Sequence, residues 1–142
     1  AQECLARVNL SEAQQKYPGE ISGGMQKRVA IARAIVLNPK YLFCDEPNSG
    51  LDPKTSLVID ELLHGITEEY NMTTIINTHD MNSVMGIGEH IIFICEGRNE
   101  WTGDKNGVIT STNEKLNDLV YASDIFKKEK KVEMAEALNK RG

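Results

Sequence analysis

Apolar residues recur along the chain at two different spacings, which predict that helices and strands alternate. Helical spacing predicts helices over residues 1–16 (as one helix or a helix-turn-helix), 25–37 and 53–70, a short helix through Val84 and Met85, and a further helix from Asn113 onward. Apolar or β-branched runs predict strands over residues 41–44, 73–78 and 90–95, with residues 98–102 returning as the hairpin partner of the last. The first and third of these strands are expected to be buried.

The helices predicted over residues 25–37 and 53–70 are each expected to carry one apolar face. The apolar positions expected to face the core are Met25, Val29, Ala32, Ile35 and Val36 in the first helix, and Leu57, Val58, Leu62 and Ile66 in the second. Ser22 is the expected cap of the first helix, and Asp52 followed by Pro53 has the composition of a helix start. Asn38 and Pro39 should end the first helix.

The order strand, helix, strand, helix, strand is typical of an α/β fold built on a mostly parallel sheet. Polar residues come directly after two of the predicted strands: Asp45 and Glu46 after the first, and His79 after the second. Since the carboxyl ends of parallel strands meet at one edge of a sheet, we expect these three side chains to gather there.

Composition limits the class of protein. The chain has 142 residues and a net charge of −5, so it fits one domain or part of one, and its acidity argues against a nucleic-acid-binding surface. The three cysteines, Cys4, Cys44 and Cys95, lack the spacing of metal ligands, and the last two are expected in the core. No apolar run approaches the about 20 residues of a membrane span, and no signal peptide is recognisable. We therefore expect a soluble, cytosolic protein, with an N-terminus that is truncated before Ala1.

The residues after the first strand suit metal and base chemistry. A carboxylate at position 45 can hold Mg²⁺ through water, and Glu46, pointing in another direction, can accept a proton from an attacking water molecule. The simpler interpretation is that Asp45, Glu46 and Pro47 end a strand and begin a turn. His79 is open to two interpretations as well: it donates to a terminal phosphate, or it is a hydrogen-bonded structural residue.

A serine and two glycines precede the first long helix. Ser22, Gly23 and Gly24 leave a bare backbone at a helix start, where N–H groups and the helix dipole favour an anion such as phosphate. The same residues also fit a plain loop with a cap. Residues 49–52 likewise fit a turn that leads to the cap at Asp52.

Four of these segments, taken together, resemble the motifs of an ABC-transporter ATPase in the order found in that family. Residues 21–34 look like the signature motif and its helix, and residues 41–47 look like a Walker B strand with its catalytic glutamate. Residues 49–52 resemble the D-loop, and residues 78–80 the switch histidine of the H-loop. The resemblance extends over about residues 11–103.

The resemblance implies roles for individual residues. Asp45 would hold the hydration shell of Mg²⁺, Glu46 would polarise the attacking water, and His79 would contact the γ-phosphate of ATP. The signature residues Ser22, Gly23, Gly24 and Met25, with Asp52 of the D-loop, would bind ATP across a head-to-tail homodimer. Met25 stands where the family usually has glutamine, and a thioether cannot make the hydrogen bonds of that amide.

A phosphate loop of the form G-x-x-x-x-G-K-[ST] is absent from the chain, which contains no Gly-Lys pair. The resemblance therefore identifies the C-terminal part of a P-loop ATPase domain, and we expect residues 1–142 alone not to hydrolyse ATP. Its expected parts are the end of a helical subdomain over residues 1–37, a catalytic core over 38–112 and a helical tail over 113–142.

Residues 45–63 and 78–84 are similar to Mla-type phospholipid transport ATPases. This similarity implies ATP and Mg²⁺ as cofactors, a second ATPase subunit and a transmembrane permease as partners, and a lipid-binding protein as a further partner. Such a subunit would lie on the cytoplasmic face of the inner membrane. The alternatives are the ATPase of a small-solute importer, such as one for a glycine betaine-like compound, a non-transport ABC protein, and a non-catalytic fragment.

Overall fold

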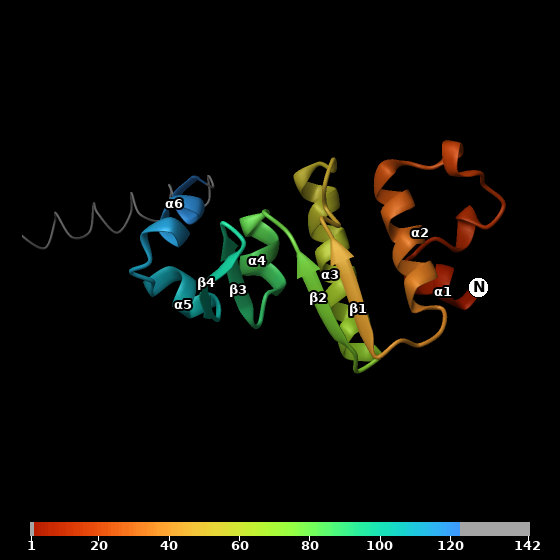
Figure 1. Ribbon diagram of the computed structural model, residues 1–142. Coiled ribbons are helices and arrows are strands. Elements are labelled where there is room, and N and C mark those ends of the chain that lie inside the picture. The colour runs from red at the N-terminus through yellow and green to blue at the C-terminus, as the bar shows by residue number, and fades with distance from the viewer. Residues whose placement is uncertain (1, 123–142) are drawn as a thin grey trace, which may run out of the picture. The chain divides into compact units, whose positions relative to one another are not determined.

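The computed structural model describes residues 2–122, which fall into two compact units that divide between Ser83 and Val84 (Figure 1). The described elements combine helices with parallel and antiparallel strands, so the predicted α/β class is confirmed. None of the helices in this part of the chain has the length and apolar character of a membrane span.

The first unit begins with short helices that lead into α2. These elements are α1 (Gln2–Arg7), the 3-10 turns η1 (Ser11–Ala13) and η2 (Pro18–Glu20), and α2 (Gly23–Ile35). As predicted, Ser22 caps α2, because its hydroxyl accepts a hydrogen bond from the Met25 N–H at 3.3 Å. The helix ends at Ile35, before the predicted residue 37, so Val36 lies outside it and is exposed rather than buried.

The parallel pair β1 (Tyr41–Asp45) and β2 (Thr73–Asn77) is joined by the long helix α3 (Pro53–Glu69). Leu42 is buried on one face of β1, whereas Tyr41 and Phe43 on the other face are 63% and 71% exposed. The expectation that this strand is buried is therefore wrong for one face. Figure 1 shows α3 running beside the pair, and the exposed fractions show that the described residues cover one face of it.

The inner face of α3 differs from the predicted one. Of the four residues expected to be buried, Ile66 is buried, Leu62 is partly exposed, and Leu57 and Val58 are 55% and 43% exposed. The buried residues are Ser56, Ile59, Asp60, Leu63 and Ile66. Two of these residues, Ser56 and Asp60, are polar, so the spacing of apolar residues alone does not reveal the buried face.

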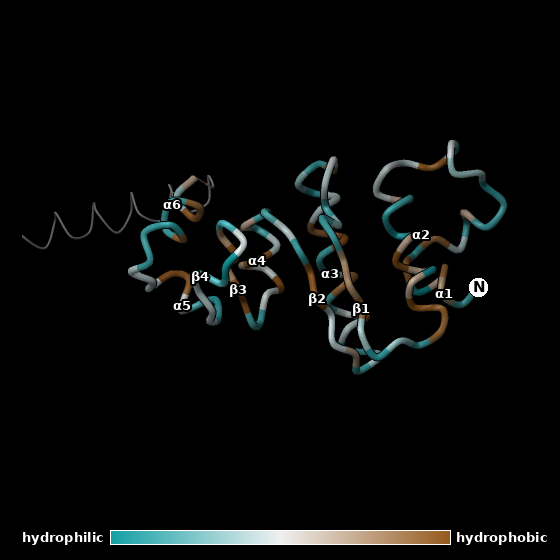
Figure 2. The backbone as a smooth tube through the Cα atoms, viewed as in Figure 1, coloured by the Kyte–Doolittle hydropathy of each residue, from teal (hydrophilic) through white to brown (hydrophobic). Residues whose placement is uncertain are grey.

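The second unit contains the predicted hairpin. After α4 (Met81–Ile87), which spans the division between the units, β3 (Ile91–Cys95) and β4 (Arg98–Gly103) pair antiparallel. Ile92 and Ile94 are 54% and 67% exposed, and the other three residues of β3 are partly exposed, so the expected burial of this strand is wrong within the described residues. Figure 2 shows the hydrophobic residues of β3 in brown.

Two helices follow the hairpin in the described part of the second unit. The first, α5 (Lys105–Thr110), has no counterpart in the sequence prediction. The second, α6 (Glu114–Ala122), is the described part of the predicted tail helix, and its Leu116 and Val120 are buried. The rest of the predicted tail, residues 123–142, lies outside the described residues.

Candidate functional site

The strand ends of the first unit meet as predicted. Asp45 and Asn77 are opposite each other in the parallel register, and the Asn77 side-chain amide donates to Asp45 Oδ1 at 2.7 Å. The Glu46 N–H donates to the Asn77 carbonyl at 2.8 Å, so the backbone just after β1 is still hydrogen-bonded to the end of β2. The carboxylate of Asp45 is therefore held in place at the edge of the sheet while it stays exposed.

Glu46 has a left-handed backbone, with φ of +45°. For a residue other than glycine this conformation is uncommon, and it is kept only where the surrounding structure fixes it. Two donors reach the Glu46 carbonyl: the Ser49 N–H at 3.1 Å and Lys27 Nζ of α2 at 3.2 Å. These contacts hold the backbone that sets the direction of the Glu46 side chain.

The Glu46 carboxylate is paired with His79. Their atoms Oε1 and Nδ1 lie 2.8 Å apart, which is a hydrogen bond when Nδ1 carries the proton. This bond, and then the negative charge of Glu46, raise the pKa of His79 above its ordinary value of 6.5. The His79 side chain is 82% exposed and that of Glu46 is 33% exposed, so both reach the surface where a ligand can bind.

Asp52 caps α3, as predicted. Its Oδ1 accepts from the N–H groups of Lys54 and Thr55, both at 3.1 Å, and its Oδ2 accepts from the Thr55 hydroxyl. The hydroxyl of Thr55 and then its N–H lower the pKa of Asp52. This carboxylate is thus occupied within its own chain, which fits the simpler interpretation of residues 49–52 and is compatible with a second role.

The glycines at the start of α2 pack against the start of α3. A Cβ atom on Gly24 would lie 2.5 Å from Thr55 Cγ2, whereas one on Gly23 would lie 3.7 Å from Leu51 Cδ2. Gly24 is buried, and Ser22 and Gly23 are exposed. Met25 is partly exposed and lines a hollow with residues that include Leu10, Lys16 and Arg28. The predicted signature residues therefore do not form one exposed cluster.

A buried polar group begins two residues after Glu46, and it is not among the predicted site residues. Asn48, in the turn after β1, hydrogen-bonds to Asp60 of α3 and to Ser83 of α4. Asp60 lies on the buried face of α3. A polar residue on such a face could have indicated the buried group, but the predicted face did not include position 60.

The residues present fit a Mg²⁺ ion that keeps most of its water. The described part of the chain holds no group of three or more acidic, histidine or cysteine side chains able to form a protein cage for a metal. Mg²⁺ is commonly bound through one or two carboxylates together with substrate phosphates. A single exposed carboxylate such as Asp45 suits that arrangement.

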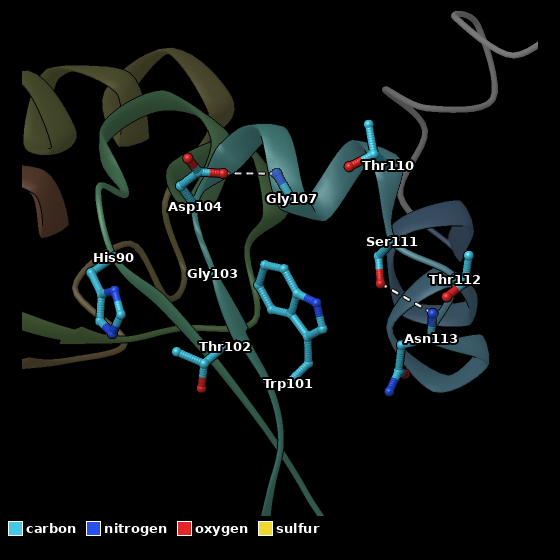
Figure 3. Close-up of a pocket in the computed structure, with 10 residues that line it drawn as sticks. All are labelled: His90, Trp101, Thr102, Gly103, Asp104, Gly107, Thr110, Ser111, Thr112 and Asn113. Atoms are coloured by element: carbon cyan, nitrogen blue, oxygen red, sulfur yellow. Dashed lines mark hydrogen bonds between the residues drawn. The ribbon is translucent and has the colours of Figure 1, made fainter.

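A hollow in the second unit is lined by ten residues, among them His90, Trp101 and Asp104 (Figure 3). The Trp101 ring occupies the space beside Gly103 and Gly107, where added Cβ atoms would lie 2.6 and 3.0 Å from it. The Asp104 carboxylate accepts from the Gly107 N–H at 2.8 Å and caps α5. The hollow contains none of the predicted site residues.

Comparison with known proteins agrees with the arrangement in the first unit. Residues 1–49 match the family model described as ABC transporter. The chain is 40% identical over 122 residues to the methionine import ATP-binding protein MetN of Clostridium acetobutylicum, a match that covers 86% of this chain and 38% of that protein. It is 46% identical over 95 residues to MetN of Vibrio cholerae, covering 67% of this chain and 28% of that protein. The chain thus spans less than half the length of these relatives.

Two solved structures are similar in fold. One is a dimeric post-hydrolysis state of the ATP-binding cassette MJ0796 bound to ADP and Pi, with a TM-score of 0.62, 39% identity, and coverage of 72% of this chain and 44% of that one. The other is the ADP conformation of MJ1267, an ATP-binding cassette of an ABC transporter, with a TM-score of 0.74, 25% identity, and coverage of 85% of this chain and 48% of that one. The chain therefore has the fold of an ABC transporter ATP-binding domain, over part of the length of such domains.

Proposed function

We propose that this chain is the C-terminal part of an ATP-hydrolysing subunit of an ABC importer for a small solute. The observation that carries the proposal is the 2.8 Å contact between Glu46 and His79, with Asp45 adjacent at the same sheet edge. It combines a candidate base, a group that can donate to phosphate and a ligand for Mg²⁺. The family match and the ADP-bound neighbours support ATP as the nucleotide.

Each residue at the edge has one task in the proposed reaction. Asp45 would hold Mg²⁺ through water, and the ion supplies positive charge to the phosphates when it is bound. Glu46 would accept the proton of the attacking water, since a positioned carboxylate base contributes about 10²–10⁴-fold to such a step. His79 would donate to the γ-phosphate from Nε2, because its Nδ1 is paired with Glu46.

The remaining motif residues would act across a dimer. The solved cassette MJ0796 is dimeric, and we propose that two copies of the subunit pair head to tail. The start of α2, with Ser22, Gly23, Gly24 and Met25, would then lie against the ATP of the other copy, with Asp52 close to the interface. A transmembrane permease would complete the transporter and hold the subunit at the cytoplasmic face of the membrane.

The class of solute rests on the relatives. The similar proteins named above are methionine import subunits, which supports the small-solute alternative over phospholipid transport. The Mla-like appearance of residues 45–63 is therefore not sufficient evidence for lipid as the substrate. We propose an amino acid such as methionine as the transported solute.

The test joins this chain to the phosphate-loop segment of its complete ATPase and combines that ATPase with its permease in vesicles. ATP-dependent uptake of labelled methionine is measured beside the transfer of a labelled phospholipid. The proposal expects uptake of the amino acid, without phospholipid transfer, and loss of uptake in Glu46→Gln. Phospholipid transfer without solute uptake would show that the assignment is wrong.

A further inference from the structure

Three buried polar side chains connect the segments that follow the two strand ends. Asn48 Nδ2 donates to Asp60 Oδ1 at 2.8 Å and to Ser83 Oγ at 2.9 Å. Asn48 is 8% exposed, Asp60 4% and Ser83 2%. One residue comes from the turn after β1, one from the middle of α3 and one from α4, so a single amide joins three elements.

The position of Asn48 relates this group to the candidate site. Asn48 lies two residues after Glu46, and Ser83 lies four residues after His79. Between Glu46 and Asn48 the chain passes through buried Pro47, which restricts the backbone. The hydrogen bond between Asn48 and Ser83 thus ties the turn that carries Glu46 to the helix that follows His79.

Stability alone does not account for the choice of these residues. The Asn48 Oδ1 atom is buried and has no hydrogen-bond partner in the described part of the chain, and a buried polar atom without a partner is unfavourable. Burial also raises the pKa of Asp60, and burial is the largest influence on the pKa of that carboxyl. Apolar residues of similar volume would avoid both costs, so the group is better explained by the geometry that it imposes.

We propose that Asn48 is a positioning residue for ATP hydrolysis, which keeps Glu46 and His79 in contact by anchoring the turn after β1 to Asp60 and Ser83. This inference rests on the proposed function of Glu46 and His79. Asn48 itself does not reach the surface at which the nucleotide would bind. Its effect is on the rate of the step that needs Glu46 and His79 together, and not on the binding of ATP.

Reversing the donor and the acceptor tests the hydrogen bond separately from packing. Asn48→Asp keeps the shape of the side chain but places a second carboxylate against Asp60, so the contact becomes repulsive. Adding Asp60→Asn supplies an amide donor to the new carboxylate and restores the bond in the opposite direction. Asn106→Ala, at an exposed position in α5, is the control for an asparagine outside the group.

In the complete ATPase, Asn48→Asp is expected to lower kcat about 10-fold to 100-fold, the range for a small misplacement of catalytic groups, while KM for ATP changes less than about twofold. The double variant should recover most of the lost kcat, and Asn106→Ala should match the wild type. A kcat loss that the double variant does not recover, or a loss no larger than the fraction of unfolded protein, would overturn the proposal.

A second readout does not depend on ATPase activity. In residues 1–142, the NMR titration of His79 reports its contact with Glu46, and Asn48→Asp should move the pKa of His79 toward 6.5, with recovery in the double variant. If Asn48→Asp does not fold, Ser83→Ala removes one of the two bonds and is expected to cause a smaller shift of the same sign. An unchanged His79 titration in a folded variant would refute the positioning role.

The two readouts separate this inference from the proposed function. If Glu46→Gln retains normal hydrolysis while Asn48→Asp still moves the His79 titration, then the proposed base is wrong and the coupling by Asn48 stands. If Glu46→Gln is inactive and the His79 titration is unaffected by Asn48→Asp, the proposed function stands and the role of Asn48 is wrong.

Discussion

The sheet edge at Asp45 and the start of α2 at Ser22 differ in the kind of group that each presents to a ligand. At the edge, the functional groups are side chains, and they already have partners within the chain: Asn77 for Asp45, and His79 for Glu46. At the start of α2 the candidate group is the backbone of Gly23 and Gly24, and Gly24 lies against Thr55 of α3.

This difference shows which kind of change each region should tolerate. The edge depends on the chemical identity of exposed carboxylates, and an isosteric amide there alters the reaction with little effect on folding. The start of α2 depends on the absence of a side chain, because Gly24 lies against Thr55. The first effect of a single added methyl group there is therefore on the packing against Thr55, and not on the reaction.

The largest expected effect is at the edge. In the complete ATPase, Glu46→Gln should lower kcat by about 10²–10⁴-fold and retain ATP binding, since the amide keeps the shape of the side chain but cannot accept the proton of water. Steady-state ATPase assays and nucleotide titrations measure the two quantities. Near-normal turnover would mean that the base lies elsewhere.

Two controls accompany this variant. Glu61→Gln makes the same chemical change at an exposed position of α3 and should leave turnover unchanged. Residues 1–142 without a phosphate loop should show no hydrolysis at all, because the backbone and the lysine of that loop hold the phosphates in this class of ATPase.

The next effect is a loss of stability at the start of α2. Gly24→Ala places a methyl group 2.5 Å from Thr55 Cγ2, and such overpacking costs about 1–3 kcal/mol. Thr55→Ser removes Cγ2 and keeps the hydroxyl that hydrogen-bonds to Asp52, so the pair Gly24→Ala and Thr55→Ser should be close to the wild type in urea unfolding.

Gly23→Ala is the matched control for this change. A Cβ at that position would lie 3.7 Å from Leu51 Cδ2, an ordinary van der Waals distance, and the unfolding midpoint should therefore stay the same or rise slightly. An equal loss of stability in Gly23→Ala and Gly24→Ala would mean that the backbone, and not the contact with Thr55, requires glycine in both places.

The same contrast explains what the sequence could predict. The edge was predicted, because parallel strands followed by polar residues bring those residues together whatever the details of packing. The caps Ser22 and Asp52 were predicted for a similar reason, since a cap depends on its own helix. These features are local or follow from topology.

Packing between elements was not predictable in the same way. Leu57 and Val58 were predicted on the buried face of α3. That face instead includes Asp60, whose hydrogen-bond partner Asn48 lies twelve residues earlier in the chain. Likewise, nothing in the sequence near Gly24 shows that Thr55 will fill the space of its missing side chain. Such pairings are set by tertiary structure and carry no periodic signal.

The smallest effect concerns the contact between Glu46 and His79. NMR titration of residues 1–142 should give His79 a pKa above 6.5, and Glu46→Gln should lower it toward that value, because the hydrogen bond and the charge of Glu46 are its main causes. An unchanged His79 titration in Glu46→Gln would contradict the contact between the two side chains.

The sign of the linked stability change follows from the raised pKa. A histidine whose folded pKa lies above its unfolded value stabilises the folded state fully below the unfolded pKa, here near 6.5, and this contribution is lost as the pH rises through the folded pKa. His79→Gln should therefore reduce stability slightly at pH 5.5 and have less effect at pH 8. A stability difference that grows with pH would contradict the contact, since it would mean that neutral His79, and not its protonated form, is favoured by folding.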